Sequence, residues 1–230
     1  MTVASNLEVI KGKVKQASIR ANRSLDDIQV IAVTKTVEID LMKEAISEGL
    51  VNLGENRVQE LTRKYEILND NNIKWHLIGH LQKNKVKYIV DKVELIHSLD
   101  SYDLALEIER RAGDIGRTIH CLVQVNVSGE ETKYGIEPNE VATFINKLED
   151  LKYVQVDGLM TIAPYTEDNE ETRVYFKRLK NIFDDISALN LKNSSMKYLS
   201  MGMSNDFEVA IEEGANLVRI GSAIFGERVY

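Results

Sequence analysis

The feature of this sequence that most constrains its fold is a regular alternation of short apolar runs with longer segments of helical periodicity. Such alternation is typical of a parallel sheet whose strands are joined by crossover helices. The apolar runs predict eight strands, at residues 29–35, 51–55, 74–79, 95–100, 119–127, 154–162, 196–202 and 217–226.

The segments between these runs carry apolar residues at spacings of three and four, which gives each helix one apolar stripe. The clearest stripe consists of Val141, Phe144, Ile145, Leu148 and Leu151. Because only a few residues follow the last predicted strand, we expect it to lack a helix of its own. An N-terminal helix could cover it instead, with an apolar face made of Leu7, Ile10, Val14 and Ala17.

Eight strands with eight helices, one of them displaced to the N-terminus, favour a particular α/β fold. A closed (β/α)8 TIM barrel with an extra N-terminal helix fits this order better than an open doubly wound sheet. The two prolines and thirteen scattered glycines leave no stretch that would serve as an interdomain linker. We therefore expect a single domain over residues 1–230.

Composition and charge narrow the classes of function. A net charge of −7 argues against nucleic acid and against anionic membranes as partners, because both attract cationic proteins. The one cysteine, Cys121, cannot form an intramolecular disulfide. Lysines spread through the first 19 residues predict neither a signal peptide nor a membrane anchor there. These features predict a cytoplasmic protein with a small metabolite as its partner.

A single lysine, Lys35, ends the almost wholly apolar first strand. The carboxyl ends of barrel strands are where functional groups gather. Burial there lowers the pKa of a lysine, so its amine becomes nucleophilic enough to form an imine with an aldehyde. The residue type alone leaves three alternatives open: a cofactor Schiff base, the imine of an aldolase substrate, or a surface lysine at a strand end.

Hydroxyl groups and glycines follow the seventh and eighth predicted strands. Loops after these two strands of a barrel often bind phosphate, with backbone N–H groups and hydroxyls as donors. We expect a helix to begin at Asn205 or Asp206, with Glu208 completing a capping box. The predicted phosphate contacts are Ser200, Gly221 and Ser222.

Several ordered motifs across the chain are together more specific than any one of them. These motifs are Ala-Val-Thr-Lys at 32–35, Gly-Glu-Asn-Arg at 54–57, Trp-His-Leu-Ile-Gly at 75–79, Leu-Gln-Lys-Asn-Lys at 81–85, Asp-Gly-Leu-Met at 157–160, Leu-Ser-Met-Gly-Met-Ser at 199–204 and Arg-Ile-Gly at 219–221. Through them the sequence, from about residue 29 to the C-terminus, resembles the YggS/PROSC family of pyridoxal 5′-phosphate (PLP) homeostasis proteins.

The resemblance implies the barrel of the alanine racemase N-terminal domain with PLP as cofactor. It implies that Lys35 holds PLP as a Schiff base and that Asn56 lies beside the cofactor. It places the phosphate near the three residues named above. It also implies that Arg219 faces the pyridine nitrogen, which a permanent cation would keep unprotonated. Lys133 matches a further family lysine, although a solvated loop position also explains it.

The resemblance further implies a non-catalytic protein that buffers, delivers or protects PLP, with PLP-dependent apo-enzymes as recipients. The alternative is a PLP-dependent enzyme acting on amino acids, such as a racemase, which needs bases on both faces of its substrate. We expect a monomer or weak dimer. The four dispersed histidines predict no metal site. The lysines at 83, 85, 87 and 92 form a basic face for solvent or a partner.

Overall fold

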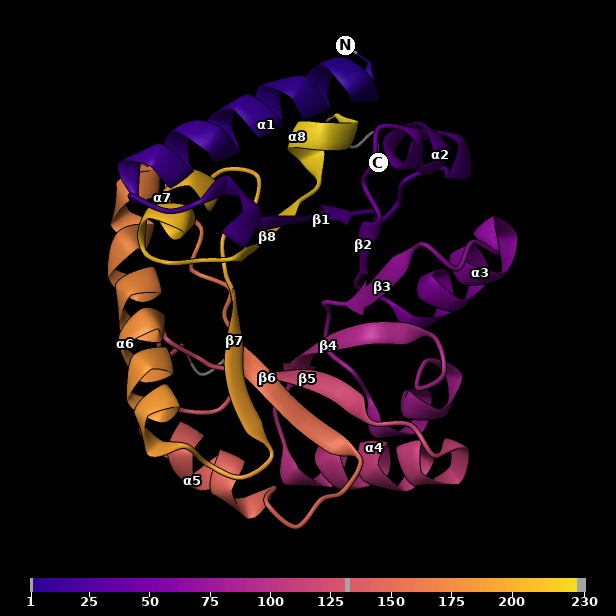
Figure 1. The fold of residues 1–230 in the computed structure, drawn as a ribbon, viewed down its shortest axis with the longest axis vertical. Coiled ribbons are helices and arrows are strands. Elements are labelled where there is room, and N and C mark those ends of the chain that lie inside the picture. Colours follow the sequence, from indigo (N-terminus) through magenta and orange to yellow (C-terminus); the bar gives the residue numbers. More distant parts are fainter. Residues whose placement is uncertain (1, 131–132, 227–230) are drawn as a thin grey trace.

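Eight parallel strands close into a barrel in which each strand pairs with its neighbours in the sequence and β8 pairs with β1. The computed structural model describes residues 2–130 and 133–226 (Figure 1). All eight predicted strands are confirmed. β2 ends where predicted, and the other seven strands end earlier than predicted. Their bounds are β1 Gln29–Val33, β2 Asn52–Glu55, β3 Lys74–Leu77, β4 Val93–Leu99, β5 Ile119–Gln124, β6 Val154–Met160, β7 Ser194–Ser200 and β8 Leu217–Ile220.

Helices surround the barrel and connect consecutive strands, as the apolar stripes predict. The third connection differs, because a 3-10 helix, η2 (Lys83–Tyr88), lies between β3 and β4. Shorter 3-10 helices are η1 (Leu25–Asp27), η3 (Pro138–Glu140) and η4 (Asn169–Thr172). The α-helices are α1 Val3–Arg20, α2 Ile39–Ser47, α3 Val58–Leu68, α4 Tyr102–Ile115, α5 Val141–Lys147, α6 Arg173–Leu189, α7 Phe207–Glu212 and α8 Ser222–Phe225.

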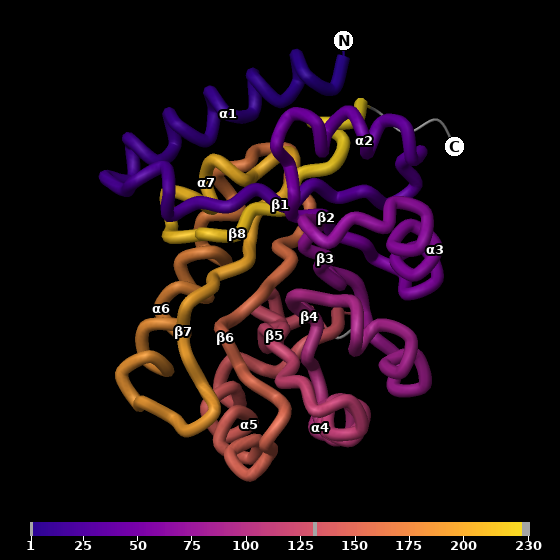
Figure 2. The backbone as a smooth tube through the Cα atoms, turned by 45° about the vertical axis from the view of Figure 1, so that its right-hand side comes forward, coloured from indigo at the N-terminus to yellow at the C-terminus, as the bar shows by residue number. Residues whose placement is uncertain are grey.

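The predicted N-terminal helix, α1, packs on α7 and α8, the helices before and after the last strand. Figures 1 and 2 show it lying across α7 and α8, and its predicted apolar face is buried. The amide of Asn6 donates to the carbonyl of Ile224 at 2.8 Å, which joins α1 directly to α8. The expectation that no helix follows the last strand was wrong: β8 ends at Ile220, and α8 uses residues that we assigned to the strand.

The barrel sheet separates two clusters of buried apolar residues, one outside and one inside the barrel. Between strands and helices lies a large apolar layer that includes Trp75 and Phe176. Alternate residues of a strand face opposite sides of the sheet, so on β8 Val218 joins this layer while Leu217 faces the inside of the barrel. The apolar cluster inside the barrel comprises Ile31, Leu95, Leu122, Met160 and Leu217.

No helix in the described ranges 2–130 and 133–226 combines the length and apolar character that crossing a membrane requires.

Candidate functional site

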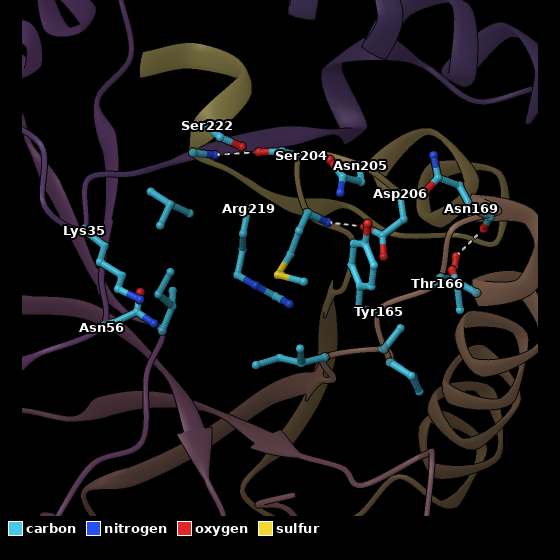
Figure 3. Close-up of a pocket in the computed structure, with 18 residues that line it drawn as sticks. Lys35, Asn56, Tyr165, Thr166, Asn169, Ser204, Asn205, Asp206, Arg219 and Ser222 are labelled. Atoms are coloured by element: carbon cyan, nitrogen blue, oxygen red, sulfur yellow. Dashed lines mark hydrogen bonds between the residues drawn. The ribbon is translucent and has the colours of Figure 1, made fainter. Parts of the chain in front are cut away.

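A cavity of about 460 Å³ opens at the carboxyl ends of the strands, where the loops after β1, β2, β6, β7 and β8 meet. Five of the six predicted binding residues line it. Figure 3 shows two of them, Lys35 and Asn56, on one side of the cavity, Arg219 between the sides, and the loop after β6 opposite. The five are Lys35, Asn56, Arg219, Gly221 and Ser222.

The backbone around Lys35 is fixed on both sides of the residue. Before it, the N–H of Thr34 donates to the carbonyl of Gly54 on β2 at 3.0 Å. After it, Thr36 adopts a left-handed φ of 63°, which is costly for a β-branched residue, and its hydroxyl donates to the carbonyl of Lys35 at 2.6 Å. The half-buried Lys35 side chain therefore starts from a rigid backbone and extends into the cavity (Figure 3).

A buried ion pair lies behind this strand end. The ammonium of Lys64 on α3 donates to Glu55 Oε1 and to the carbonyl of Thr34, both at 2.7 Å, and the Thr34 hydroxyl donates to the same carboxylate at 2.6 Å. Both charged side chains are almost fully buried. This pair was not predicted from the sequence, although Lys64 lies three residues after Leu61 and six after Val58, within the apolar stripe of α3.

Arg219 places a buried cation at the centre of the site. It is 3% exposed; its Nη1 donates to the Ser200 hydroxyl at 2.6 Å and its Nη2 to the carbonyl of Thr161 at 2.8 Å. Burial lowers the pKa of the guanidinium to about 10, which still leaves it charged at neutral pH. The two hydrogen bonds hold the guanidinium where it lines the cavity.

Ser200 does not line the cavity, so its predicted phosphate contact does not fit this geometry. It is the last residue of β7 and is fully buried inside the barrel. Its hydroxyl oxygen accepts from Arg219 and lies 2.9 Å from His97 Nδ1. We extended this strand to residue 202, two residues too far, and therefore placed Ser200 too near the loop.

Ser204 is the serine that the sequence analysis missed. Its hydroxyl oxygen accepts from the N–H groups of Gly221 and Ala223, at 3.1 and 3.4 Å. Because both bonds use acceptor capacity, the hydroxyl proton is free to donate toward the cavity that Ser204 lines. Ser204 follows Ser200 in the same motif, and only the observed end of β7 distinguishes their positions.

The turn from β7 into α7 differs from the predicted capping box. The helix begins at Phe207 with Asp206 as its N-cap, and the Asp206 carboxylate accepts from the N–H of Met203 at 2.6 Å. Glu208 instead accepts from Arg20 of α1 at 3.0 Å. Burial raises the pKa of Asp206, which also lines the cavity. Gly202 permits this turn, since its φ is 89° and a Cβ there would lie 2.9 Å from the Phe207 Cα.

Asn56 offers the cavity an unpaired acceptor. Its Oδ1 is buried and has no hydrogen-bond partner among the described residues. Gly79 lets the chain pass close behind it, because a Cβ at that position would lie 2.3 Å from the Asn56 carbonyl oxygen. A buried oxygen without a partner is costly, so a ligand that donates a hydrogen bond suits this position.

The other lysines named from the sequence lie away from this cavity. Lys133 forms an ion pair with Glu130 at 2.8 Å, while the preceding residue of its motif, Thr132, lies outside the described residues. Lys83 pairs with Asp103 at 2.8 Å on the exposed surface around η2. Among the described residues, Lys35 is therefore the lysine that lines the cavity.

Comparison with known proteins identifies the family of this chain. The sequence matches the family described as alanine racemase, N-terminal domain, over residues 5–229. The chain belongs to this family. A curated relative from Aquifex aeolicus, named pyridoxal phosphate homeostasis protein, is 45% identical over the full length of both chains. One of the same name from Haemophilus influenzae is 33% identical and covers 100% of this chain and 98% of the relative.

A solved structure extends the comparison to three dimensions. PipY from Synechococcus elongatus, described with PLP bound, superposes with a TM-score of 0.83 at 33% identity, covering 98% of this chain and 100% of PipY. The resemblance to the YggS/PROSC family drawn from the sequence motifs is confirmed.

Proposed function

We propose that this chain is a non-catalytic PLP-binding protein of PLP homeostasis, in which residues 1–230 form one domain and Lys35 holds PLP as a Schiff base. The observation that carries the proposal is that Lys35 and Arg219 line the same cavity. Lys35 supplies an amine that has no ion-pair partner among the described residues, and Arg219 supplies a buried cation. The names of the relatives and the PLP-bound PipY structure support the choice of ligand.

The groups around the cavity fit the separate parts of PLP. Ser204 and Ser222 supply hydroxyl donors, and such donors suit a phosphate monoester. Gly221 lies beside them, and its N–H positions the Ser204 hydroxyl by donating to its oxygen. The unpaired Asn56 Oδ1 suits a donor on the ligand. In this assignment Ser204 replaces Ser200, whose hydroxyl is already bonded inside the barrel.

Arg219 suits the ring nitrogen of the cofactor. When bound, PLP supplies an aldehyde that forms imines with amines and a pyridine ring that withdraws electrons. A guanidinium that stays charged cannot accept a proton, so next to the ring it would keep the nitrogen unprotonated. The unprotonated ring is the weaker electron sink, which favours holding PLP over using it for carbanion chemistry. We infer that PLP-dependent apo-enzymes receive the cofactor.

Attachment through Lys35 can be tested by borohydride reduction and peptide mass mapping. We expect a pyridoxyl adduct on Lys35 in the native protein, and loss of the visible absorbance of bound PLP in Lys35→Ala. Lys83→Ala, which changes an exposed lysine far from the cavity, is the matched control and should retain both signals. An adduct on another lysine, with none on Lys35, would contradict the assignment.

The racemase alternative predicts a different result. Because Arg219 limits delocalisation of charge into the ring, we expect no substantial exchange of the α-proton of common amino acids for deuterium and no change in their chirality. Both are measured by incubating the PLP-loaded protein with each amino acid in deuterated buffer. Exchange with racemisation at typical enzymatic rates of about 1 to 1,000 per second would favour an enzyme.

A further inference from the structure

A chain of hydrogen bonds crosses the inside of the barrel from the cavity to the amino end of the strands. It starts at Arg219, whose Nη1 lies 2.6 Å from Ser200 Oγ, and continues from that oxygen to His97 Nδ1 at 2.9 Å. His97 Nε2 then lies 3.1 Å from His76 Nδ1, and His76 Nε2 lies 3.3 Å from Oδ1 of Asn52, the first residue of β2. We call this set the histidine chain.

One end of the histidine chain fixes the direction of every hydrogen bond in it. Asn52 Oδ1 can only accept, so His76 carries its proton on Nε2 and accepts at Nδ1. His97 therefore carries its proton on Nε2, donates to His76 Nδ1, and accepts at its own Nδ1 from the Ser200 hydroxyl, whose oxygen accepts from Arg219. The opposite tautomers would set two acceptors against each other at Asn52.

Both imidazoles are neutral in this arrangement. Each ring is completely enclosed, and burial lowers the pKa of His76 to about 3 and that of His97 well below its ordinary value. Arg219 therefore carries the only charge in the histidine chain. Each group presents an oxygen or an unprotonated nitrogen toward the guanidinium side, so the dipoles stabilise the cation.

This arrangement explains how the barrel holds a cation without neutralising it. Among the described residues, no carboxylate forms an ion pair with Arg219, although Asp206 acts on it through space. Its hydrogen bonds go to the Ser200 hydroxyl and the Thr161 carbonyl, both of which are uncharged. A carboxylate partner would satisfy the same N–H groups but would cancel the positive charge beside the cavity.

We propose that His97 and His76 are positioning residues that orient Arg219 as an unneutralised cation toward the cofactor ring. The proposal rests on the proposed PLP site for the identity of the ligand. It goes beyond that site because it assigns roles to residues that do not line the cavity and reaches as far as Asn52 at the other end of the barrel.

The histidine chain itself is tested on the protein without cofactor, by nuclear magnetic resonance of ¹⁵N-labelled histidines. We expect His76 and His97 to show one protonated nitrogen, Nε2, and no titration between pH 5 and 8. The half-exposed His120, which has a carboxylate partner, should titrate and serves as the internal reference. Protonation of either buried ring on Nδ1, or its titration in this range, would overturn the proposal.

The effect on the site is tested with His97→Phe, which keeps a ring of similar shape but leaves the Ser200 proton without an acceptor. With PLP labelled by ¹⁵N in the pyridine ring, we expect a shift of the ring-nitrogen resonance relative to native protein and a Kd about tenfold higher. His120→Phe, a histidine outside the chain, is the matched control and should change neither. Equal behaviour of the two variants would overturn the proposal.

A milder variant covers the case in which His97→Phe does not fold. Asn52→Ala removes only the terminal acceptor, so the same ring-nitrogen shift should appear at smaller size, and its absence would count against the histidine chain. A native protein that bound no PLP would refute the proposed function, and with it the role toward the ring. The histidine spectra would still report the tautomers, so the two failures are distinguishable.

Discussion

Two asparagine side chains at opposite ends of the barrel differ in how their polar groups are paired. At the amino end, the amide of Asn216 is paired with backbone: it accepts from the N–H of Leu199 at 2.7 Å and donates to the carbonyl of Lys197 at 2.6 Å. At the carboxyl end, the buried Oδ1 of Asn56 has no hydrogen-bond partner within the described chain, and Asn56 lines the cavity together with Lys35 and Ser222. A buried polar atom without a partner costs stability, so Asn56 marks this end of the barrel for a ligand.

The buried ion pair of Glu55 and Lys64 has a different role from either asparagine. It lies at the carboxyl end, yet it is fully paired and contacts the backbone next to Lys35. The comparison therefore separates three groups of residues: those that hold the fold, those that meet the ligand, and this pair, which supports the strand end that carries the ligand residue.

The largest effect is expected from Lys64→Met. Removing one partner leaves the Glu55 carboxylate buried without compensation, which costs about 3–5 kcal/mol of unfolding free energy. Denaturant titration measures the loss. Lys43→Met, on the exposed face of α2, is the matched control and should be nearly neutral. A loss below about 1 kcal/mol, the value typical of surface pairs, would show that the pair does not hold the strand end.

The ligand side of the comparison is tested with Ser222→Ala. One hydrogen bond to a charged group contributes about 1.5–3 kcal/mol, so the Kd for PLP should rise while the melting temperature of the cofactor-free protein stays constant. Asn216→Ala should give the reverse pattern, with lower stability of the cofactor-free protein and little change in Kd. If both variants altered the same quantity, the division between the two ends would be refuted.

The smallest effect is expected at His120, near the amino end of β5. Its Nδ1 lies 2.7 Å from Asp157 Oδ2, and this hydrogen bond raises the pKa of the imidazole above its ordinary 6.5. The stabilisation is therefore complete below pH 6.5 and is lost as the pH rises through the higher folded value. Because the side chain is half exposed, we expect less than about 1 kcal/mol.

The check is the melting temperature of native protein and His120→Gln at several pH values. The difference between them should be larger at pH 5.5 than at pH 9. A difference that grew toward alkaline pH would contradict the sign of the pKa shift.

The order of strands and helices was predictable from the sequence because buried parallel strands give short apolar runs, and helices give apolar residues spaced by three or four. Lys35 was predictable for a related reason, since an isolated charge at the end of an apolar run stands out. Ser200 was misplaced because its direction depends on where β7 ends, to within two residues. The pairing of His76 with His97 could not be predicted, because it depends on the register between β3 and β4, which brings residues 21 apart into contact.

The position of α1 has a consequence for how this chain folds. The helix is made before α7 and α8, on which it packs, and Asn6 bonds to a residue 218 positions later. Until those residues emerge, the native partners available to α1 are η1 and α2, which follow it closely in the chain. Contacts between distant parts of a chain form late because loop closure must precede them. Closure of the barrel and docking of α1 on α7 and α8 are thus delayed until β8 and α8 have been made.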